Sequence, residues 1–433
     1  MIKKPGTDAF SSSFLLQASV VVLLLLYVAN CFTPLRLTHD TIRYFQIETW
    51  MENRLDGTEG TMHDFLPFGY SGLLLLLSIT HLLHPFVITF INLAFLIGSI
   101  FFVSKIFGTM ISQLQLLIAV LLSWLSIKFV ITPLSEMQFL YFSTGALYFY
   151  ARYRKENRIV LLFVSFLFFL IALFTRSIAI ALIIAFLFTL LIESKNRIRQ
   201  QIATHKKISA VIAVGLIALI YFFKELRITV YANYFINPIR RLGPAILMRN
   251  VLHHLSDWAE LFVNAPSSKI SFLSGGLRLI LFAIIGIIFL AATIYILLKK
   301  NNGIPSVIKC YVIIYIIIVL TWPYYESRFW LPVMPFAIVA LLQIKSERTT
   351  MPGKLILLAK YFYVLAGVFA LSYYTYTSFN KKALAEKQDA GIWKDAYEIH
   401  FFGKTGEDSL PPKKQQALDL LNQIDKPLFR GNR

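Results

Sequence analysis

Long apolar segments separated by short polar ones run through most of the chain. They recur from residue 14 into the 370s, and many are long enough to cross a hydrocarbon layer about 30 Å thick. Because lipid offers the backbone no hydrogen-bond partners, such segments are expected to cross as α-helices. A transmembrane barrel would instead show short segments of alternating polarity. The pattern therefore predicts an all-α, polytopic transmembrane helix bundle.

The composition supports a membrane protein. Hydrophobic residues make up 57% and charged residues 15% of the 433 residues, and the mean hydropathy is +0.66, which is more apolar than a soluble chain. The formal net charge of +19 raises the question of nucleic acid. However, Lys and Arg fall mostly in short segments between apolar runs, where membrane insertion favours them. We therefore expect no nucleic-acid partner.

The basic segments predict an orientation. The N-terminal run lacks a small-residue cleavage site, which indicates an uncleaved signal anchor with a cytoplasmic N-terminus. Basic clusters at 152–158, 195–207, 299–309 and 345–354 predict cytoplasmic loops. Successive spans must alternate between the two sides of the membrane, and these loops can all be cytoplasmic only if residues 69–83 do not cross it. We therefore expect about 11 transmembrane helices.

This count divides the chain into four parts. The first is a transmembrane region, 1–224, which contains a first outer loop at 34–67. A large outer loop at 225–276, C-terminal transmembrane helices at 277–376 and a polar tail at 377–433, expected on the outer face, follow. Within the first outer loop, apolar side chains between residues 41 and 54 gather on one helical face, which predicts an amphipathic helix lying on the membrane surface.

Charged side chains collect at the predicted outer ends of the apolar segments. Asp40 follows the first span, Glu136 begins a later one, and Arg176 interrupts the apolar run between residues 161 and 192. Glu326 and Arg328 stand at the mouth of another span. Charges on one common side predict a single site that faces the outer aqueous phase.

In this order the motifs resemble the GT-C glycosyltransferases. The similarity lies in an acidic residue after the first span followed by Arg43-Tyr44, a juxtamembrane helix, and a Pro-Phe-Gly-Tyr stretch at 67–70 before the next apolar segment. The stretches at 132–136, 175–177 and 326–332 also resemble family positions, so the resemblance extends over most of the chain.

The resemblance implies a GT-C-like bundle that transfers a sugar from a polyprenyl-phosphate carrier, similar to lipid A aminoarabinose transferases and protein O-mannosyltransferases. It implies an integral protein of the bacterial inner membrane with its active site on the outer face. His39-Asp40-Thr41 stands where several relatives carry two adjacent acids, so metal dependence does not carry over to this chain.

Such a transfer needs a base for the acceptor hydroxyl and cations for the departing phosphate. Asp40 is the candidate base. Glu136 could position the acceptor or, with Asp40, hold a divalent cation, and helix capping is the alternative for both residues. Arginine suits phosphate because guanidinium stays charged and offers forked donors. The candidates for the donor phosphate are Arg176, Arg240, Arg241 and Arg328. Further candidates for substrate binding are His39, Arg43, Tyr44, Asp64, which is also a rival base, Tyr70 and Glu326.

Simpler explanations exist for two of the arginines. Arg176 could extend along apolar surface toward the interface, and Arg328 could pair with Glu326 or anchor a helix at the membrane boundary. No His or Cys spacing predicts a metal site or cofactor, and no ligand pattern supports a divalent cation.

The expected partners are a polyprenyl-phosphate-linked sugar donor, an acceptor that is a lipid, glycan or protein, and the bilayer. Two other functions stay open. One is an O-antigen or polysaccharide polymerase or ligase. The other is a lipid or solute transporter, which would place polar residues along a central path.

Overall fold

The computed structural model describes residues 8–57, 66–108, 110–193, 228–299, 303–344, 350–403 and 410–425. Within these ranges every regular element is helical, which confirms the all-α prediction. The α-helices are α1 (Asp8–Cys31), α2 (His39–Leu55), α3 (Gly69–Ile79), α4 (Pro85–Phe107), α5 (Gln113–Leu121), α6 (Trp124–Val130), α7 (Glu136–Glu156), α8 (Ile159–Thr175), α9 (Ile180–Glu193), α12 (Ile228–Leu242), α13 (Ala245–Val263), α14 (Gly275–Leu298), α15 (Ser306–Thr321), α16 (Met334–Gln343), α17 (Met351–Phe379), α18 (Lys381–Lys387), α19 (Lys394–Phe402) and α20 (Pro412–Ile424). The 3-10 helices are η1 (Ser177–Ala179), η2 (Ser267–Lys269), η3 (Ser327–Val333) and η4 (Gln388–Gly391).

Several helices have the length and composition of membrane spans. Among the described residues, α1, α4, α14 and α17 each satisfy both requirements. Helices α5 and α6 satisfy them together but bend by 66° at a break, and shorter apolar segments include α3, α8 and α15. These helices support a membrane-embedded bundle, but they do not establish the predicted number of about 11 crossings.

Helix α3 is the segment that we expected not to cross. Its 11 residues span about 16 Å, roughly half the thickness of the hydrocarbon layer. It packs against α2, where the Ser71 hydroxyl donates a 2.8 Å hydrogen bond to the Tyr44 carbonyl. Its short length is therefore consistent with a segment that lies at one end of the bundle.

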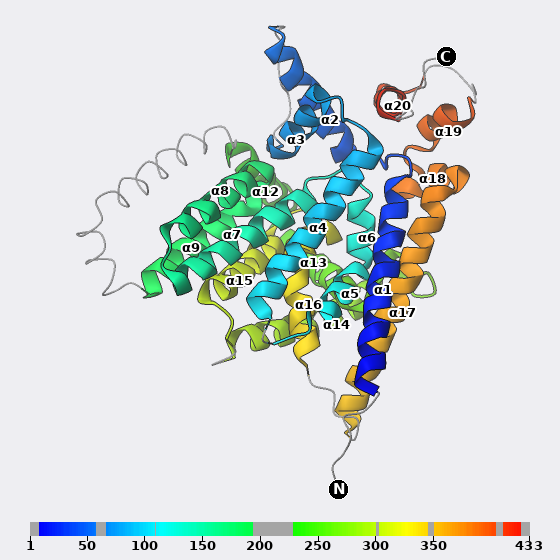
Figure 1. The fold of residues 1–433 in the computed structure, drawn as a ribbon. Coiled ribbons are helices and arrows are strands. Elements are labelled where there is room, and N and C mark those ends of the chain that lie inside the picture. The colour runs from blue at the N-terminus through cyan, green and yellow to red at the C-terminus, as the bar shows by residue number, and fades with distance from the viewer. Residues whose placement is uncertain are drawn as a thin grey trace, which may run out of the picture.

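The helices at the two chain ends meet beside α2. In Figure 1, α1 and α17 lie side by side and both lead to the end of the bundle where α2, α3 and α18 to α20 gather. Asn30 on α1 donates a 2.9 Å hydrogen bond to Thr375 on α17. The Tyr397 hydroxyl of α19 binds the segment between α1 and α2, donating to the Leu35 carbonyl at 2.6 Å and accepting from the Leu37 amide at 2.9 Å. The polar C-terminal segment therefore contains helices that pack near the start of α2.

The described part of the predicted large outer loop contains the α-helices α12 and α13, the 3-10 helix η2 and the first residues of α14. Helix α13 packs closely against α14 and buries Trp258, His254 and Glu260. It ends at Asn264, whose backbone is left-handed with φ +57°, as is common for Asn after a helix.

Asn264 also holds the break between α5 and α6. Its amide nitrogen donates to the carbonyls of Leu122 and Tyr363, both at 2.9 Å, and its oxygen accepts from the Trp124 amide at 2.8 Å. The bonds with Leu122 and Trp124 satisfy backbone groups at the 66° bend between α5 and α6, and the bond to Tyr363 connects the same site to α17. The break thereby fixes the direction of α6, which carries Lys128 toward the site described next.

Candidate functional site

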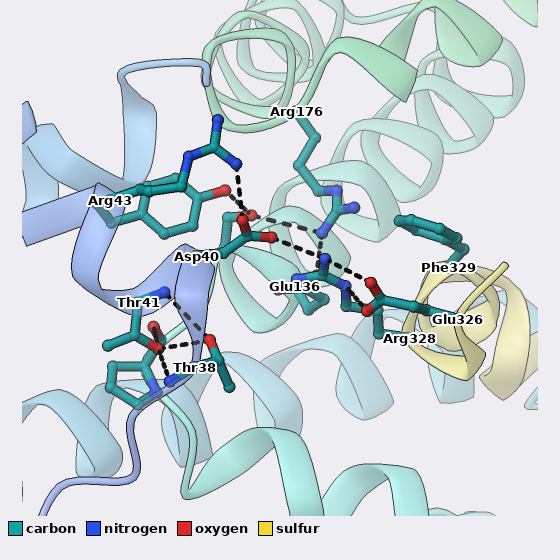
Figure 2. Close-up of polar contacts among 12 residues, drawn as sticks. Thr38, Asp40, Thr41, Arg43, Glu136, Arg176, Glu326, Arg328 and Phe329 are labelled. Carbon is teal, nitrogen blue, oxygen red and sulfur yellow. Dashed lines mark hydrogen bonds and ion pairs between the residues drawn. The ribbon is translucent and has the colours of Figure 1, made fainter. Parts of the chain in front are cut away.

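Charged side chains from four separate parts of the chain meet in one cluster (Figure 2). Three are carboxylates and three are guanidiniums. The cluster consists of Asp40 and Arg43 on α2, Glu136 at the start of α7, Arg176 between α8 and η1, and Glu326 and Arg328 at the start of η3.

The start of α2 is capped without the Asp40 carboxylate. Thr38 is the N-cap: its hydroxyl accepts from the Thr41 amide at 3.1 Å, while the Thr41 hydroxyl accepts from the Thr38 amide at 3.2 Å. The Thr41 hydroxyl also donates to the Pro133 carbonyl at 3.2 Å, which ties α2 to the segment before α7. The capping alternative for Asp40 is therefore wrong, because a threonine already performs that role.

Glu136 is the most deeply buried acid of the cluster, with a side chain only 2% exposed. Its Oε1 atom accepts a hydrogen bond from Nη1 of Arg176 and lies 3.6 Å from Nη1 of Arg328. Its Oε2 atom is buried and has no hydrogen-bond partner within the described ranges. Glu136 therefore pairs with arginine across the bundle, and the capping alternative is wrong here too.

The Arg328 guanidinium joins three carboxylates. Its Nη2 atom lies 2.7 Å from Oδ2 of Asp40, its Nε atom 2.6 Å from Oε2 of Glu326, and its Nη1 atom 3.6 Å from Oε1 of Glu136. The side chain is only 14% exposed, so an interfacial anchor does not describe it. The expected pairing with Glu326 is present, but it is one contact of three.

Arg176 also points into the cluster and not toward the interface. Its side chain is 17% exposed, and its guanidinium lies 5.8 Å from the centroid of the Phe329 ring. Arg328 lies 5.5 Å from the same ring. Ser135 links Arg176 to α2, because its hydroxyl lies 3.5 Å from Nη1 of Arg176 and 2.7 Å from the Tyr44 hydroxyl.

The arginines determine the protonation of Asp40. Burial alone would raise the pKa of its carboxyl, but the positive charges and hydrogen bonds of Arg328 and Arg43 outweigh burial and lower that pKa below its ordinary value. Oδ1 lies 2.9 Å from Nη1 of Arg43, so each carboxylate oxygen has a cationic partner. Asp40 is therefore ionised at neutral pH and, in this arrangement, a weak base.

The cluster separates two cavities of different character. One, of about 640 Å³, is lined by apolar side chains such as Leu173, Ile183 and Val319, and also by all three arginines of the cluster. The other, of about 530 Å³, is lined mainly by polar side chains. We call them the apolar cavity and the polar cavity. The residues common to both linings are Asp40, Glu326 and Arg328.

Some of the remaining predicted residues line these cavities. Tyr44 lines the apolar cavity. His39 lines the polar cavity, and its ring meets the Trp393 ring edge-on at 4.8 Å between centroids. Tyr70 is buried against Tyr44, with 5.1 Å between the ring centroids, and lines neither cavity, so its role is to support Tyr44.

Other predicted residues lie elsewhere. Arg240 and Arg241 are exposed near the end of α12 and line neither cavity, so the structure does not bring them together with the other predicted phosphate-binding arginines. Among the described side chains of α12, Tyr234, near the middle of the helix, lines the apolar cavity. Asp64 lies outside the described residues.

Several residues of the cluster and the polar cavity were not among the predicted site residues. Arg36 follows the first span on the predicted outer side, so the reasoning applied to Arg176 would have selected it. Lys128 interrupts an apolar run and carried a similar signal. Nothing in the sequence distinguishes Ser135 or Phe329 from neighbouring serines and phenylalanines, because their roles depend on tertiary contacts.

Within the described ranges, no three His, Cys, Asp or Glu side chains are grouped closely enough to hold a metal ion. Comparison of the chain with protein-family models, curated proteins and solved structures found no match. The function must therefore be argued from the site itself.

Proposed function

We propose that this chain is a membrane glycosyltransferase that moves a sugar from a polyprenyl-phosphate carrier to an acceptor at the outer face of the bacterial inner membrane. The observation that carries the proposal is the meeting of an apolar and a polar cavity at Arg328, with Asp40 at their shared boundary. A lipid-linked donor and a polar acceptor need such an arrangement, with their reacting groups brought together and their remaining parts kept in different environments.

The donor would occupy the apolar cavity. Side chains including Leu173, Ile183, Ile318 and Val319 suit a prenyl chain. Arg43, Arg176 and Arg328 line the same cavity, and guanidinium forms strong, forked hydrogen bonds with phosphate oxygens. The lipid phosphate would therefore lie at the cluster, with its sugar directed toward the polar cavity.

The transfer is a substitution at the anomeric carbon of the sugar. An acceptor oxygen forms the new bond to that carbon while the bond to the phosphate oxygen breaks, and the polyprenyl phosphate leaves with the electron pair. The acceptor proton passes to Asp40. Arginines beside the departing phosphate stabilise the charge that develops on it, and no oxidant or reductant is involved.

Donor binding would also activate Asp40. In the donor-free arrangement, Arg328 and Arg43 hold its carboxylate and lower its pKa. A phosphate competes for the same guanidiniums, and its negative charge opposes ionisation of the nearby carboxylate. Both effects raise the pKa of Asp40 toward a range suited to a base. Proton acceptance would therefore depend on the presence of the donor.

The proposal is tested with the purified full-length chain in nanodiscs. Mass spectrometry first identifies any prenyl-phosphate lipid that copurifies, and the chain is then given a synthetic prenyl-phosphate sugar together with a membrane lipid extract as acceptor. The expected products are free prenyl phosphate and a glycosylated acceptor. Movement of the intact donor between leaflets without cleavage would instead identify a transporter. Absence of both reactions across a panel of sugars would reject the proposal.

A further inference from the structure

The carboxylates that line the polar cavity are already occupied. Five basic and four acidic side chains form part of its lining, and each acid has a partner. Asp40 and Glu326 pair with Arg328, Glu260 accepts from the Ser267 amide at 2.6 Å and the Ser327 hydroxyl at 2.5 Å, and Asp389 accepts from the Trp393 indole at 3.0 Å. These acids are therefore poorly placed to bind a cationic substrate.

The other four basic side chains of the lining have no carboxylate within ion-pair distance among the described residues, and each lies over an aromatic ring instead. Arg36 lies 5.7 Å from the centroid of the Tyr374 ring, Lys269 and Lys387 each lie 5.8 Å from that of Tyr373, and Lys128 lies 5.1 Å from that of Phe129. Rings attract a cation but do not neutralise it. Glu326, Glu260 and Asp389 are near enough for their charges to act on Lys128, but none of them forms an ion pair with these four side chains in the described part of the chain. Their charged groups are therefore not blocked by a carboxylate and can contact an anion.

Arg36 gives independent support, because its residue is only 3% exposed. Its guanidinium donates to neutral groups, namely the Gln388 amide oxygen at 3.1 Å, the Tyr374 carbonyl at 3.2 Å and two hydroxyls on α17. Its buried Nε atom has no hydrogen-bond partner within the described ranges. Burying a cation without a counter-charge is costly, and an anion in the adjoining cavity would offset that cost.

The C-terminal helices form part of the same wall. Asp389, Ala390 and Gly391 have left-handed backbones with φ of 49°, 54° and 80°, which is strained for the first two residues. Gln388 lies between Lys387 and this turn and reaches the α1–α2 segment, where it contacts Arg36 and donates a 3.0 Å hydrogen bond to the Leu37 carbonyl. The Gln388 contacts therefore tie the end of α18, which carries Lys387, to the wall of the polar cavity.

We propose that the polar cavity binds an acceptor through an anionic group of phosphate type, held by Lys128, Lys269 and Lys387, with Arg36 stabilising it from the wall. The inference rests on the proposed transferase function, since it names the acceptor class for that site. The anion comes either from a lipid head group or from a soluble phosphorylated sugar. The acceptor hydroxyl would be carried on the same molecule and directed toward Asp40.

Binding is measured separately from transfer. Full-length protein in phosphatidylcholine nanodiscs is titrated with glucose 6-phosphate and with glucose. In a second arm, the protein is placed in nanodiscs that contain either phosphatidic acid or diacylglycerol, and its binding of the two lipids is compared. In at least one arm, the phosphate compound should bind about tenfold more tightly than its neutral counterpart, and added salt should weaken that binding. The arm that shows this preference identifies the source of the anion.

The double variant Lys269→Gln/Lys387→Gln should lose this preference for phosphate, and so should Lys128→Gln. Both lysines of the double variant are exposed, so their replacement should not prevent folding. Lys382→Gln is the matched control. Lys382 is an exposed lysine on α18, the helix that carries Lys387, and it does not line the polar cavity. Equal binding of charged and neutral probes in both arms, or an unchanged preference in the lysine variants, would overturn the inference.

A transfer assay separates this inference from the function on which it rests. If the wild type glycosylates neutral and phosphorylated acceptors equally well, and the lysine variants do the same, the transferase proposal stands and the anionic acceptor is rejected. If phosphate binds through the lysines but no transfer to any acceptor occurs, the anion site stands and the transferase proposal is rejected.

Discussion

The two cavities on either side of Arg328 treat their charges differently. On the apolar side, the three arginines of the cluster are paired with three carboxylates, so the cluster is formally neutral without any ligand. On the polar side, four basic side chains have no carboxylate partner in the described part of the chain. The proposed lipid phosphate would therefore displace internal ion-pair partners, whereas the proposed anionic acceptor would meet cations that form no ion pair among the described residues. The comparison predicts that variants in the cluster alter donor use and proton transfer, and that variants of the lysines alter acceptor binding.

The largest expected effect is that of Asp40→Asn. Asparagine keeps the size of the side chain but cannot accept a proton at neutral pH, so turnover should fall about 10²- to 10⁴-fold. Folding should persist, because Thr38 and not Asp40 caps α2. The measurement is transfer from a synthetic prenyl-phosphate sugar, with thermal unfolding in detergent as the check on folding. Normal turnover in this variant would show that the proton goes elsewhere.

The next largest effect is a loss of folding stability, which should differ between a buried acid and an exposed acid of the same cluster. Glu136→Gln removes the charge that balances Arg176 in a buried site, and breaking such a pair costs about 3 kcal/mol of folding free energy. Glu326→Gln is the matched variant: the Glu326 side chain is 53% exposed, so its loss should cost about 1 kcal/mol or less. Denaturant unfolding of both variants tests the difference. Similar losses would mean that burial does not set the strength of these pairs.

Lysine substitutions separate charge from geometry in the donor site. Arg176→Lys and Arg328→Lys keep the positive charge but lose the forked donors, so each should lower kcat/KM for the donor about tenfold. If both arginines hold one phosphate, the double variant should be no worse than the poorer single variant. Arg240→Lys and Arg241→Lys serve as controls, since neither side chain lines a cavity. Fully active Arg176→Lys and Arg328→Lys variants would remove both arginines from the phosphate site.

These comparisons also indicate what the sequence could and could not predict. Lipid imposes helical structure on long apolar runs, so the fold class was predictable. Asp40, Glu136, Arg176 and Arg328 were predicted to share one side, because charges at membrane boundaries are costly unless they have partners or a function. Their pairing could not be predicted, since hydropathy gives the ends of helices and not which ends meet.

The failures have the same physical origin. Arg240 and Arg241 were selected for their charge, but Tyr234, about two turns earlier on α12, is the residue that lines the apolar cavity, and local sequence does not determine where the helix lies. Arg36 lies within the first predicted outer loop, yet its importance depends on contacts with Gln388 and Tyr374. Contacts over such sequence distances follow from the packing of the whole bundle.

The smallest expected effect concerns α19 and α20. Helix α19 packs against α20 and against α18, and α18 and η4 carry the C-terminal residues that line the polar cavity. On α19, Nδ1 of His400 lies 2.8 Å from Oδ1 of Asn422 in α20. Its Nε2 atom lies 3.1 Å from Oδ2 of Asp425, the residue that follows α20. The hydrogen bond with Asp425 raises the pKa of His400 above its ordinary value, although partial burial and the positive charge of Lys381 oppose this shift. The protonated form is therefore favoured in the folded state.

The sign of the pH dependence follows from that shift. A pKa raised by folding gives stability that is fully present below the unfolded value of 6.5 and is lost as the pH rises through the folded value. Hydrogen exchange, corrected for its intrinsic pH dependence, should show less protection of α19 and α20 at alkaline pH than at mildly acid pH, with α8 and α9 unchanged. His400→Gln should remove this difference, and His253→Gln, a histidine of α13, should leave it intact. If protection of α8 falls together with that of α19 as the pH rises, the helices beside the two cavities unfold as one cooperative unit and not independently.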